Sequence, residues 1–299
     1  MSSILFCDID LINEQGVHTP HAYVGVQNGL IAYVGTEDPR KGTVTQEISQ
    51  TLENMQESGQ APLGAQGGSL QSEESAQTPQ QESIEGVHYD EVYDGRGKVL
   101  MPGLYNAHSH VPMLLRGLGE NLPLDRWLNE AIFPFEALMT DKDSYYATLA
   151  GIAEMLRFGV VSFTDMYYHS EARAKAIIES GAKCNLGHSV LDFDPDISYD
   201  EIPESAKNQE LITQFNGAAN SRLLVDFNLH AEYTSTQKVA EGLAQAAKEA
   251  GVRMQVHVCE TAAEVEGCKE RHNGMTPVEY LAQCGIFDVP TTAAHCVWL

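Results

Sequence analysis

A pair of histidines in the middle of the chain has the spacing of a metal site. His108 and His110 follow the short run of residues 104–107, which has the pattern of a strand. Side chains alternate between the two faces of a strand, so both imidazoles point the same way and Ser109 points the opposite way. Two imidazoles on one face can hold one cation. A His-x-His pair alone is more often a coincidence, so its context decides.

Two later stretches also deliver histidines at strand ends. Residues 252–258 are an apolar run that includes His257, with Glu260 three residues on, and residues 291–295 end at His295. In a barrel of parallel strands, such ends converge on one face, where active sites lie. Taken singly, His257 could bind a backbone carbonyl, Glu260 could begin a helix whose dipole suits its charge, and His295 could simply pack. Together with the first pair, they predict one metal site.

These residue types suggest metal-assisted hydrolysis. His108, His110 and His257 would bind the cation through neutral nitrogens, and a catalytic zinc has about three protein ligands and an open position for water. The cation would lower the pKa of that water toward about 7 and so give hydroxide at neutral pH. Glu260 would take the proton from the water and deliver it to the substrate.

Three motifs occur in an order that resembles the amidohydrolase superfamily. Within it, the chain is similar to the methylthioadenosine/S-adenosylhomocysteine deaminases and their chlorohydrolase relatives. The similarity runs from about residue 89 to the end and is weaker over the first forty residues. The motifs are Pro102-Gly103-Leu104-x-Asn106-x-His108-x-His110, Val256-His257-x-x-Glu260-Thr261 and Ala293-Ala294-His295-Cys296-Val297, with Arg116-Gly117, Trp127-Leu128, Phe133-Pro134-Phe135-Glu136 and Thr164-Asp165-Met166-Tyr167 in support.

The resemblance implies a fold, a cofactor and an activity. The fold would be a TIM-type (β/α)8 barrel, and each subunit would hold one divalent metal, zinc or alternatively iron. The activity would be hydrolytic deamination of an adenine-like nucleoside by a metal-bound hydroxide, with release of ammonia. The alternatives are a related amidohydrolase or chlorohydrolase that acts on another N-heterocycle, or a non-catalytic truncated remnant.

The resemblance also implies roles for individual residues. His295 would orient or stabilise the attacking hydroxide, Glu136 would bind ribose hydroxyls, and His230 would line the pocket. His188 stands where members that use S-adenosylhomocysteine carry an arginine for the substrate carboxylate, and a histidine cannot form the same bidentate pair. The acidic stretch at residues 192–200 would also repel a carboxylate. An uncharged or cationic substrate is therefore favoured.

The elements expected around these residues alternate between strands and helices, as in βα units. Strands are predicted at residues 159–165, 183–190, 223–229, 252–258 and 291–295, and helices at 141–158 after Thr140 and at 236–250 before Gly251. With the first histidine strand, this makes about six of the eight strands of a barrel. The family's metal-binding aspartate of the eighth strand has no match, so we expect a fragment whose activity alone is doubtful.

The N-terminal part has a different character. Residues 101–299 would form the partial barrel, and residues 1–100 would form part of a small β-sandwich, with a hairpin at Asn28-Gly29. Residues at about 38–88 are rich in Gln, Ser, Glu and Gly, and such a segment buries too little apolar area to offset its ordering entropy. We therefore predict a disordered insertion there, and a regulatory or partner-binding loop is the alternative.

Bulk composition excludes several classes of function. The formal net charge of −24 argues against nucleic-acid and anionic-membrane surfaces, but it does not disfavour a neutral nucleoside. Six cysteines without regular spacing indicate reduced thiols. The chain has neither a signal peptide nor an apolar run long enough to span a bilayer, so a cytoplasmic location is expected. A homo-oligomer is possible. The remaining histidines, His18, His21, His88 and His272, are expected to be solvated.

Overall fold

The computed structural model describes residues 3–41, 87–114 and 117–299. The chain divides into two compact units, Met1–Pro102 and Gly103–Leu299. Most of the predicted insertion, residues 42–86, lies outside the described residues, as does Arg116.

The described part of the first unit is one five-stranded mixed sheet with the order β3-β2-β1-β4, and β5 also pairs with β1. Neighbours β1, β2 and β3 are antiparallel, whereas β4 and β5 run parallel to β1. Asn28 (φ 53°) and Gly29 (φ 80°) are both left-handed, which confirms the tight hairpin between β2 and β3. The strands are β1 (Ile4–Ile12), β2 (His18–Gln27), β3 (Leu30–Gly35), β4 (Glu91–Asp94) and β5 (Val99–Leu100).

The second unit is built on six parallel strands that neighbour one another in chain order. The first and last strands approach each other at their carboxyl ends, where the ring centroids of His108 and His295 are 5.1 Å apart. The sheet is therefore a nearly closed barrel, and the prediction of an incomplete TIM-type barrel of about six strands is confirmed. The strands are β6 (Leu104–Ser109), β7 (Val160–Tyr167), β8 (Lys183–Val190), β9 (Leu223–Ala231), β10 (Met254–Val258) and β11 (Thr291–His295).

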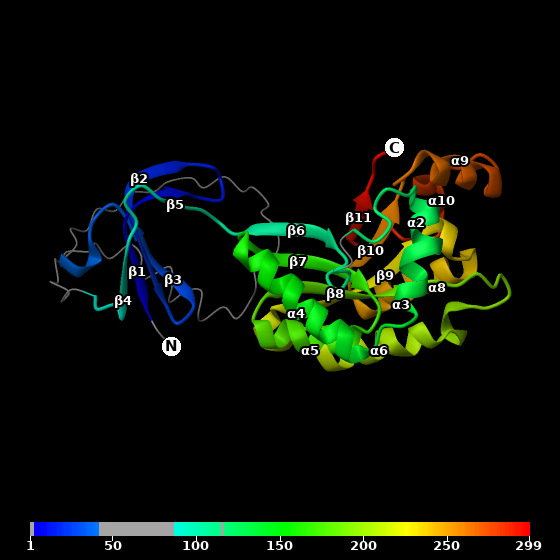
Figure 1. Ribbon diagram of the computed structural model, residues 1–299, viewed down its shortest axis with the longest axis horizontal. Helices are drawn as coiled ribbons and strands as arrows, with labels where there is room; N and C mark the ends of the chain where they lie inside the picture. Colours follow the sequence, from blue (N-terminus) through cyan, green and yellow to red (C-terminus); the bar gives the residue numbers. More distant parts are fainter. Residues whose placement is uncertain (1–2, 42–86, 115–116) are drawn as a thin grey trace, which may run out of the picture. The chain divides into compact units, whose positions relative to one another are not determined.

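Helices follow the strands and cover the outside of this sheet. Figure 1 shows α4, α5 and α6 along the part formed by β6, β7 and β8. Thr140 and Thr236 cap α4 and α8 as expected, and Gly251 (φ 66°) ends α8. The longer helices are α4 (Asp141–Arg157), α5 (Ser170–Ser180), α6 (Pro203–Phe215), α8 (Gln237–Ala250), α9 (Ala262–Arg271) and α10 (Pro277–Gln283), and the short ones are α2 (Leu124–Trp127), η2 (Leu128–Ile132), α3 (Phe133–Glu136), η3 (Tyr199–Glu201), α7 (Ala218–Ser221) and η4 (Glu232–Thr234).

Alternation along the strands separates an apolar outer face from a polar inner face. On β10, Met254, Val256 and Val258 pack in the apolar cluster under the helices, whereas Gln255 and His257 point the other way. The strand interior therefore carries polar chemistry toward the carboxyl ends, and the helix-facing residues hold the barrel together. All six cysteines are free, and no helix in the described segments has the length and apolarity needed to cross a bilayer.

Candidate active site

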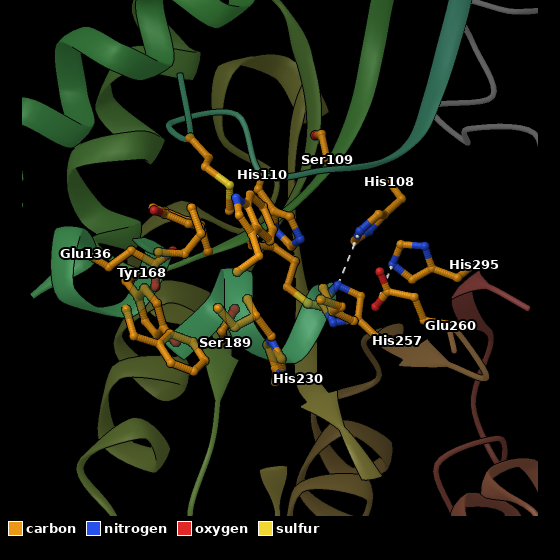
Figure 2. Close-up of a pocket in the computed structure, with 18 of the residues that line it drawn as sticks. His108, Ser109, His110, Glu136, Tyr168, Ser189, His230, His257, Glu260 and His295 are labelled. Carbon is orange, nitrogen blue, oxygen red and sulfur yellow. Dashed lines mark hydrogen bonds and ion pairs between the residues drawn. The ribbon is translucent and has the colours of Figure 1, made fainter. Parts of the chain in front are cut away.

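His108 from β6 and His257 from β10 meet at the carboxyl ends of their strands (Figure 2). Their Nε2 atoms are 3.2 Å apart. Two nitrogens that each lie about 2.0–2.1 Å from a tetrahedral zinc would be about 3.4 Å from each other. The observed separation therefore fits a pair of imidazoles that share one cation.

Two more imidazoles surround this pair. The ring centroid of His110 is 4.8 Å from that of His108 and 5.2 Å from that of His257. His295 has a ligand nitrogen that lies within 4.8 Å of those of His108 and His257, so these three form a candidate ligand set among the described residues. The sequence had suggested His110 as the third ligand and His295 as a catalytic neighbour, and the structure brings all four rings together.

The hydrogen bonds of His110 and His295 differ. His110 Nδ1 donates to the carbonyl oxygen of Met166 at 2.5 Å, which leaves Nε2 with its lone pair free. A second hydrogen bond of this kind is usual for a metal-binding histidine. His295 Nε2 lies 3.6 Å from Glu260 Oε2, and both side chains are partly exposed. His110 is thus oriented by a backbone carbonyl, whereas His295 has a carboxylate as its neighbour.

Burial keeps the imidazoles of His108, His110, His230 and His257 neutral. It lowers the pKa of His108 to about 3, with help from the neighbouring histidines, and it lowers the pKa of His230 to about 4. The pKa values of His110 and His257 are lowered by burial too. Neutral imidazole is the form that binds metals, so the cluster is ready for a cation at pH 7.

The cluster lies at one end of a cavity of about 340 Å³. One wall is apolar and comes from the helical segment that runs from α2 through η2 to α3. Glu136, at the end of that segment, faces the cavity opposite the histidines (Figure 2). The lining residues are His108, Ser109, His110, Met113, Leu124, Trp127, Leu128, Ile132, Phe133, Glu136, Met166, Tyr167, Tyr168, Ser189, His230, Tyr233, His257, Glu260 and His295.

Glu136 and His230 both line the cavity. Burial raises the pKa of the Glu136 carboxyl, and the Tyr167 hydroxyl, which also lines the cavity, donates to Met139 Sδ at 3.5 Å. His230 Nδ1 lies 2.9 Å from Thr234 Oγ1, and its ring centroid is 4.8 Å from that of His257. Both side chains therefore line the cavity as the sequence suggested.

His188 is not brought to this cavity. It lies on the outer face of β8 with Cys184 and Leu186, and its Nδ1 is 2.5 Å from Ser170 Oγ of α5. A second cavity on that side includes it. Ser189, the next residue, lines the candidate site instead. The predicted substrate contact of His188 is therefore withdrawn, because alternation along the strand turns its side chain toward the helices.

A second group of candidate ligands, Glu232, Cys268 and His272, is held together by hydrogen bonds within the protein and is better explained as structural than as a metal site. Glu232 is buried, and its carboxylate already accepts hydrogen bonds from Arg271 and lies 2.7 Å from His272 Nε2. Burial raises the pKa of the nearby Cys268 thiol to about 12, so the thiolate is scarce. His272 also stacks on Tyr280 at 3.7 Å, so the expectation that His272 is solvated was wrong. His18, His21 and His88 are exposed, as expected.

Several lining residues were not identified from the sequence. Ser189 could have been found from the alternation on β8, because it is the polar residue opposite the apolar face. Tyr167 is the last residue of the Thr164-Asp165-Met166-Tyr167 motif, but no chemistry was assigned to it. Tyr168 and Tyr233 carry no sequence signal, since only the packing of the strand ends turns them inward.

Comparison with known proteins shows the family to which the chain belongs. The model of the amidohydrolase family matches residues 99–299. The chain is 41% identical over 212 residues to a 5'-deoxyadenosine deaminase from Methanothermobacter thermautotrophicus, a match that covers 70% of this chain and 49% of that protein. It is 37% identical over 218 residues to a 5-methylthioadenosine/S-adenosylhomocysteine deaminase from Dictyoglomus thermophilum, covering 73% and 50%. The chain thus spans about half the length of the curated relatives it matches.

Solved structures share the fold. An adenosine deaminase from Xanthomonas campestris with bound zinc has a TM-score of 0.70 and 24% identity, over 95% of this chain and 55% of that one. A guanine deaminase from C. acetobutylicum with bound guanine has a TM-score of 0.71 and 17% identity, over 97% and 61%. From the family match over residues 99–299 and the identity to these relatives, the chain belongs to the amidohydrolase family.

Proposed function

We propose that the protein is a metal-dependent deaminase of adenine-like nucleosides. The observation that carries the proposal is the 3.2 Å approach of His108 Nε2 to His257 Nε2, with Glu260 and His295 beside it and Glu136 across the same cavity. His108, His110 and His257 would hold a divalent cation, zinc in the first instance and iron as the alternative. When bound, that cation supplies the Lewis acidity that turns a water into a nucleophile at neutral pH.

The protein's own residues would move the protons of the reaction. Glu260 would accept the proton of the attacking water and pass it to the ring nitrogen beside the carbon that is attacked. His295, at 3.6 Å from Glu260, would orient that water and stabilise its charge. The amino group then leaves as ammonia, and water supplies the oxygen of the product, so atoms balance as nucleoside plus water giving the hydroxylated ring plus ammonia.

The rest of the cavity suits an uncharged nucleoside. Glu136 would accept hydrogen bonds from ribose hydroxyls, and the apolar segment with Trp127 and Leu128 would contact the substituent beyond the sugar. Among the described residues that line the cavity there is no Lys or Arg to pair with a carboxylate or phosphate. We therefore favour adenosine-like substrates with an uncharged substituent, the kind named for the 5'-deoxyadenosine deaminases, over S-adenosylhomocysteine.

The rival hydrolase function uses the same attacking water on another N-heterocycle, such as a triazine. Glu136 argues for the nucleoside, since a carboxylate that faces the far end of the cavity has hydroxyls to bind on ribose and none on a triazine. A cytoplasmic location and a homo-oligomer stay predictions.

A nucleoside panel with added zinc tests the proposal. Ammonia release from adenosine, 5'-deoxyadenosine, methylthioadenosine and S-adenosylhomocysteine would be followed for residues 1–299 and for any longer product of the same reading frame. Glu260→Gln should lower kcat by about 10²–10⁴-fold with little change in KM, because it removes the proton carrier and not the binding surface. Deamination of none of the nucleosides, or turnover unaffected by Glu260→Gln, would show that the proposal is wrong.

A further inference from the structure

The carboxyl end of β6 is fixed to β7 residue by residue. The Val111 backbone N–H donates to Asp165 Oδ1 at 2.8 Å, and His110 Nδ1 donates to the Met166 carbonyl at 2.5 Å. Two consecutive residues of one strand end thus bind two consecutive residues of the next. The ring of His110 is oriented by this contact, and its Nε2 is left free to bind a cation.

Asp165 is in turn held by Arg173 of α5. Both side chains have no exposed surface, and Arg173 Nη1 lies 2.5 Å from Asp165 Oδ2. The same guanidinium donates to the carbonyls of Tyr167 (2.7 Å), Tyr168 (2.8 Å) and Gly187 (2.7 Å). One buried cation therefore ties the ends of β7 and β8 to each other and, through Asp165, to the residue after His110.

Burying the Asp165–Arg173 ion pair is unfavourable in solvation free energy. Desolvation of two charges offsets much of their attraction, and well-packed apolar side chains of similar volume often stabilise a fold equally well. What apolar side chains cannot do is accept the Val111 N–H or bind three carbonyls at once. The pair is thus suited to setting geometry rather than to adding stability.

We propose that Asp165 and Arg173 are positioning residues for the metal centre: together they hold the β6 end so that His110 keeps its Nδ1–H tautomer and presents Nε2 to the cation. Neither side chain lines the cavity, so neither touches substrate. The inference rests on the proposed metal site, but it does not depend on which substrate is used.

The test compares the double variant Asp165→Leu/Arg173→Leu with the single variants and with a matched pair elsewhere. Arg173→Leu alone should lower the Tm strongly, because it leaves a buried carboxylate without its partner, and the double variant should regain the part of that loss that comes from the unpaired carboxylate. Zinc affinity, measured by calorimetry on the full chain, should stay about 10–100-fold weaker in the double variant. Glu232→Leu/Arg271→Leu removes a carboxylate–guanidinium pair that lies outside the four-histidine cluster, with Glu232 buried and Arg271 half-exposed, and it should leave zinc affinity at that cluster unchanged.

A second measurement uses the metal-free protein. ¹⁵N NMR of histidine-labelled chain should show the Nδ1–H tautomer of His110 in the parent and a mixture of tautomers in the double variant. Asp165→Asn keeps an acceptor for the Val111 N–H, so it should lose less zinc affinity than Asp165→Leu. It replaces the leucine variants in the test if these do not fold.

The outcomes separate the two proposals. The inference would be overturned if the double variant kept both the zinc affinity and the His110 tautomer of the parent. It would also be overturned if Asp165→Asn and Asp165→Leu both kept them. The pair would then have a purely structural role. A parent chain that binds no zinc overturns it as well. A parent that binds zinc through this unit but deaminates no nucleoside leaves the inference standing and removes only the proposed function.

Discussion

At the scale of single residues, the site depends on imidazoles that do not carry charge. His108 and His230 have pKa values lowered to about 3 and about 4, chiefly because they are buried. A protonated ring here would be desolvated and would repel its neighbours. Burial thus disfavours the charged forms of four histidines: His108, His110, His230 and His257. The neutral forms have lone pairs available where the strand ends meet.

The roles of His110 and His295 can be separated by substitution. His110→Ala should weaken zinc binding by at least about 10–100-fold, because it removes a ligand oriented by Met166. His295→Ala should keep most of the zinc and lower kcat by about 10²–10³-fold, because it removes a group that stabilises developing charge. Calorimetry and steady-state kinetics on both variants check this. Loss of zinc only in His295→Ala would assign His295 as the third ligand in place of His110.

Glu136 should give substrate binding a distinctive pH dependence. Burial raises its pKa, so as pH falls the carboxylate becomes protonated at a higher pH than an exposed glutamate and loses acceptor capacity for ribose. The preference for a ribonucleoside over its 2',3'-dideoxy analogue should therefore be full at neutral pH and should decline on mild acidification. Inhibition constants measured across this range check it, and in Glu136→Gln the ratio should be low and independent of pH.

At the scale of secondary structure, the alternation of a buried strand decides which side chains reach the site. On β8 the two adjacent residues His188 and Ser189 face opposite ways, one toward α5 and the other into the cavity. A shift of register by one residue would exchange them. The apolar residues Cys184 and Leu186 fix the register, because they must lie under the helices.

Substitutions of these two residues should therefore differ in effect: Ser189 should affect KM, and His188 should affect the free energy of unfolding. Ser189→Leu places a larger side chain in the cavity. The crowding should weaken substrate binding by about 1–3 kcal/mol and so raise KM about tenfold or more. His188→Leu should leave KM unchanged and lower the free energy of unfolding by about 1 kcal/mol, through loss of the hydrogen bond to Ser170. Kinetics and denaturant titrations of both variants measure this. A changed KM in His188→Leu would restore that residue to the substrate site.

At the scale of the whole catalytic unit, the proposed cation would join strands that are far apart in the sequence. His108 lies at the end of the first strand of the barrel and His257 at the end of the fifth, and their rings meet across its mouth. A metal that binds only the folded form stabilises it by mass action. The closure of the sheet and the occupancy of the site are therefore expected to be linked.

Metal removal should show that linkage. Zinc at 100 times its dissociation constant should add about 2.7 kcal/mol to the free energy of unfolding, and a chelator should abolish the gain. Thermal unfolding with and without zinc measures it, with His108→Ala as the variant whose Tm should not respond. An equal response of His108→Ala to zinc would place the stabilising metal elsewhere.

Much of the architecture was already determined by local sequence. The strands at residues 183–190 and 291–295 were predicted at their observed bounds, and the caps at Thr140 and Thr236 lie where expected. These features depend on neighbouring residues alone, through alternation, capping and the conformational preference of glycine. The histidines of the proposed metal site were also evident in the sequence, because a metal needs specific side chains at the ends of strands.

Only the tertiary structure decided which residues share the cavity. Tyr168 and Tyr233 line the cavity, whereas His188 lies on the other face of its strand. A ligand nitrogen of His295 lies within 4.8 Å of those of His108 and His257. The Asp165–Arg173 pair has no local signal either, since it links a strand to the following helix and to the end of another strand. The sequence thus determined the elements and the chemistry they carry, because these depend on near neighbours. Their convergence depends on how distant strands pack, which no local pattern specifies.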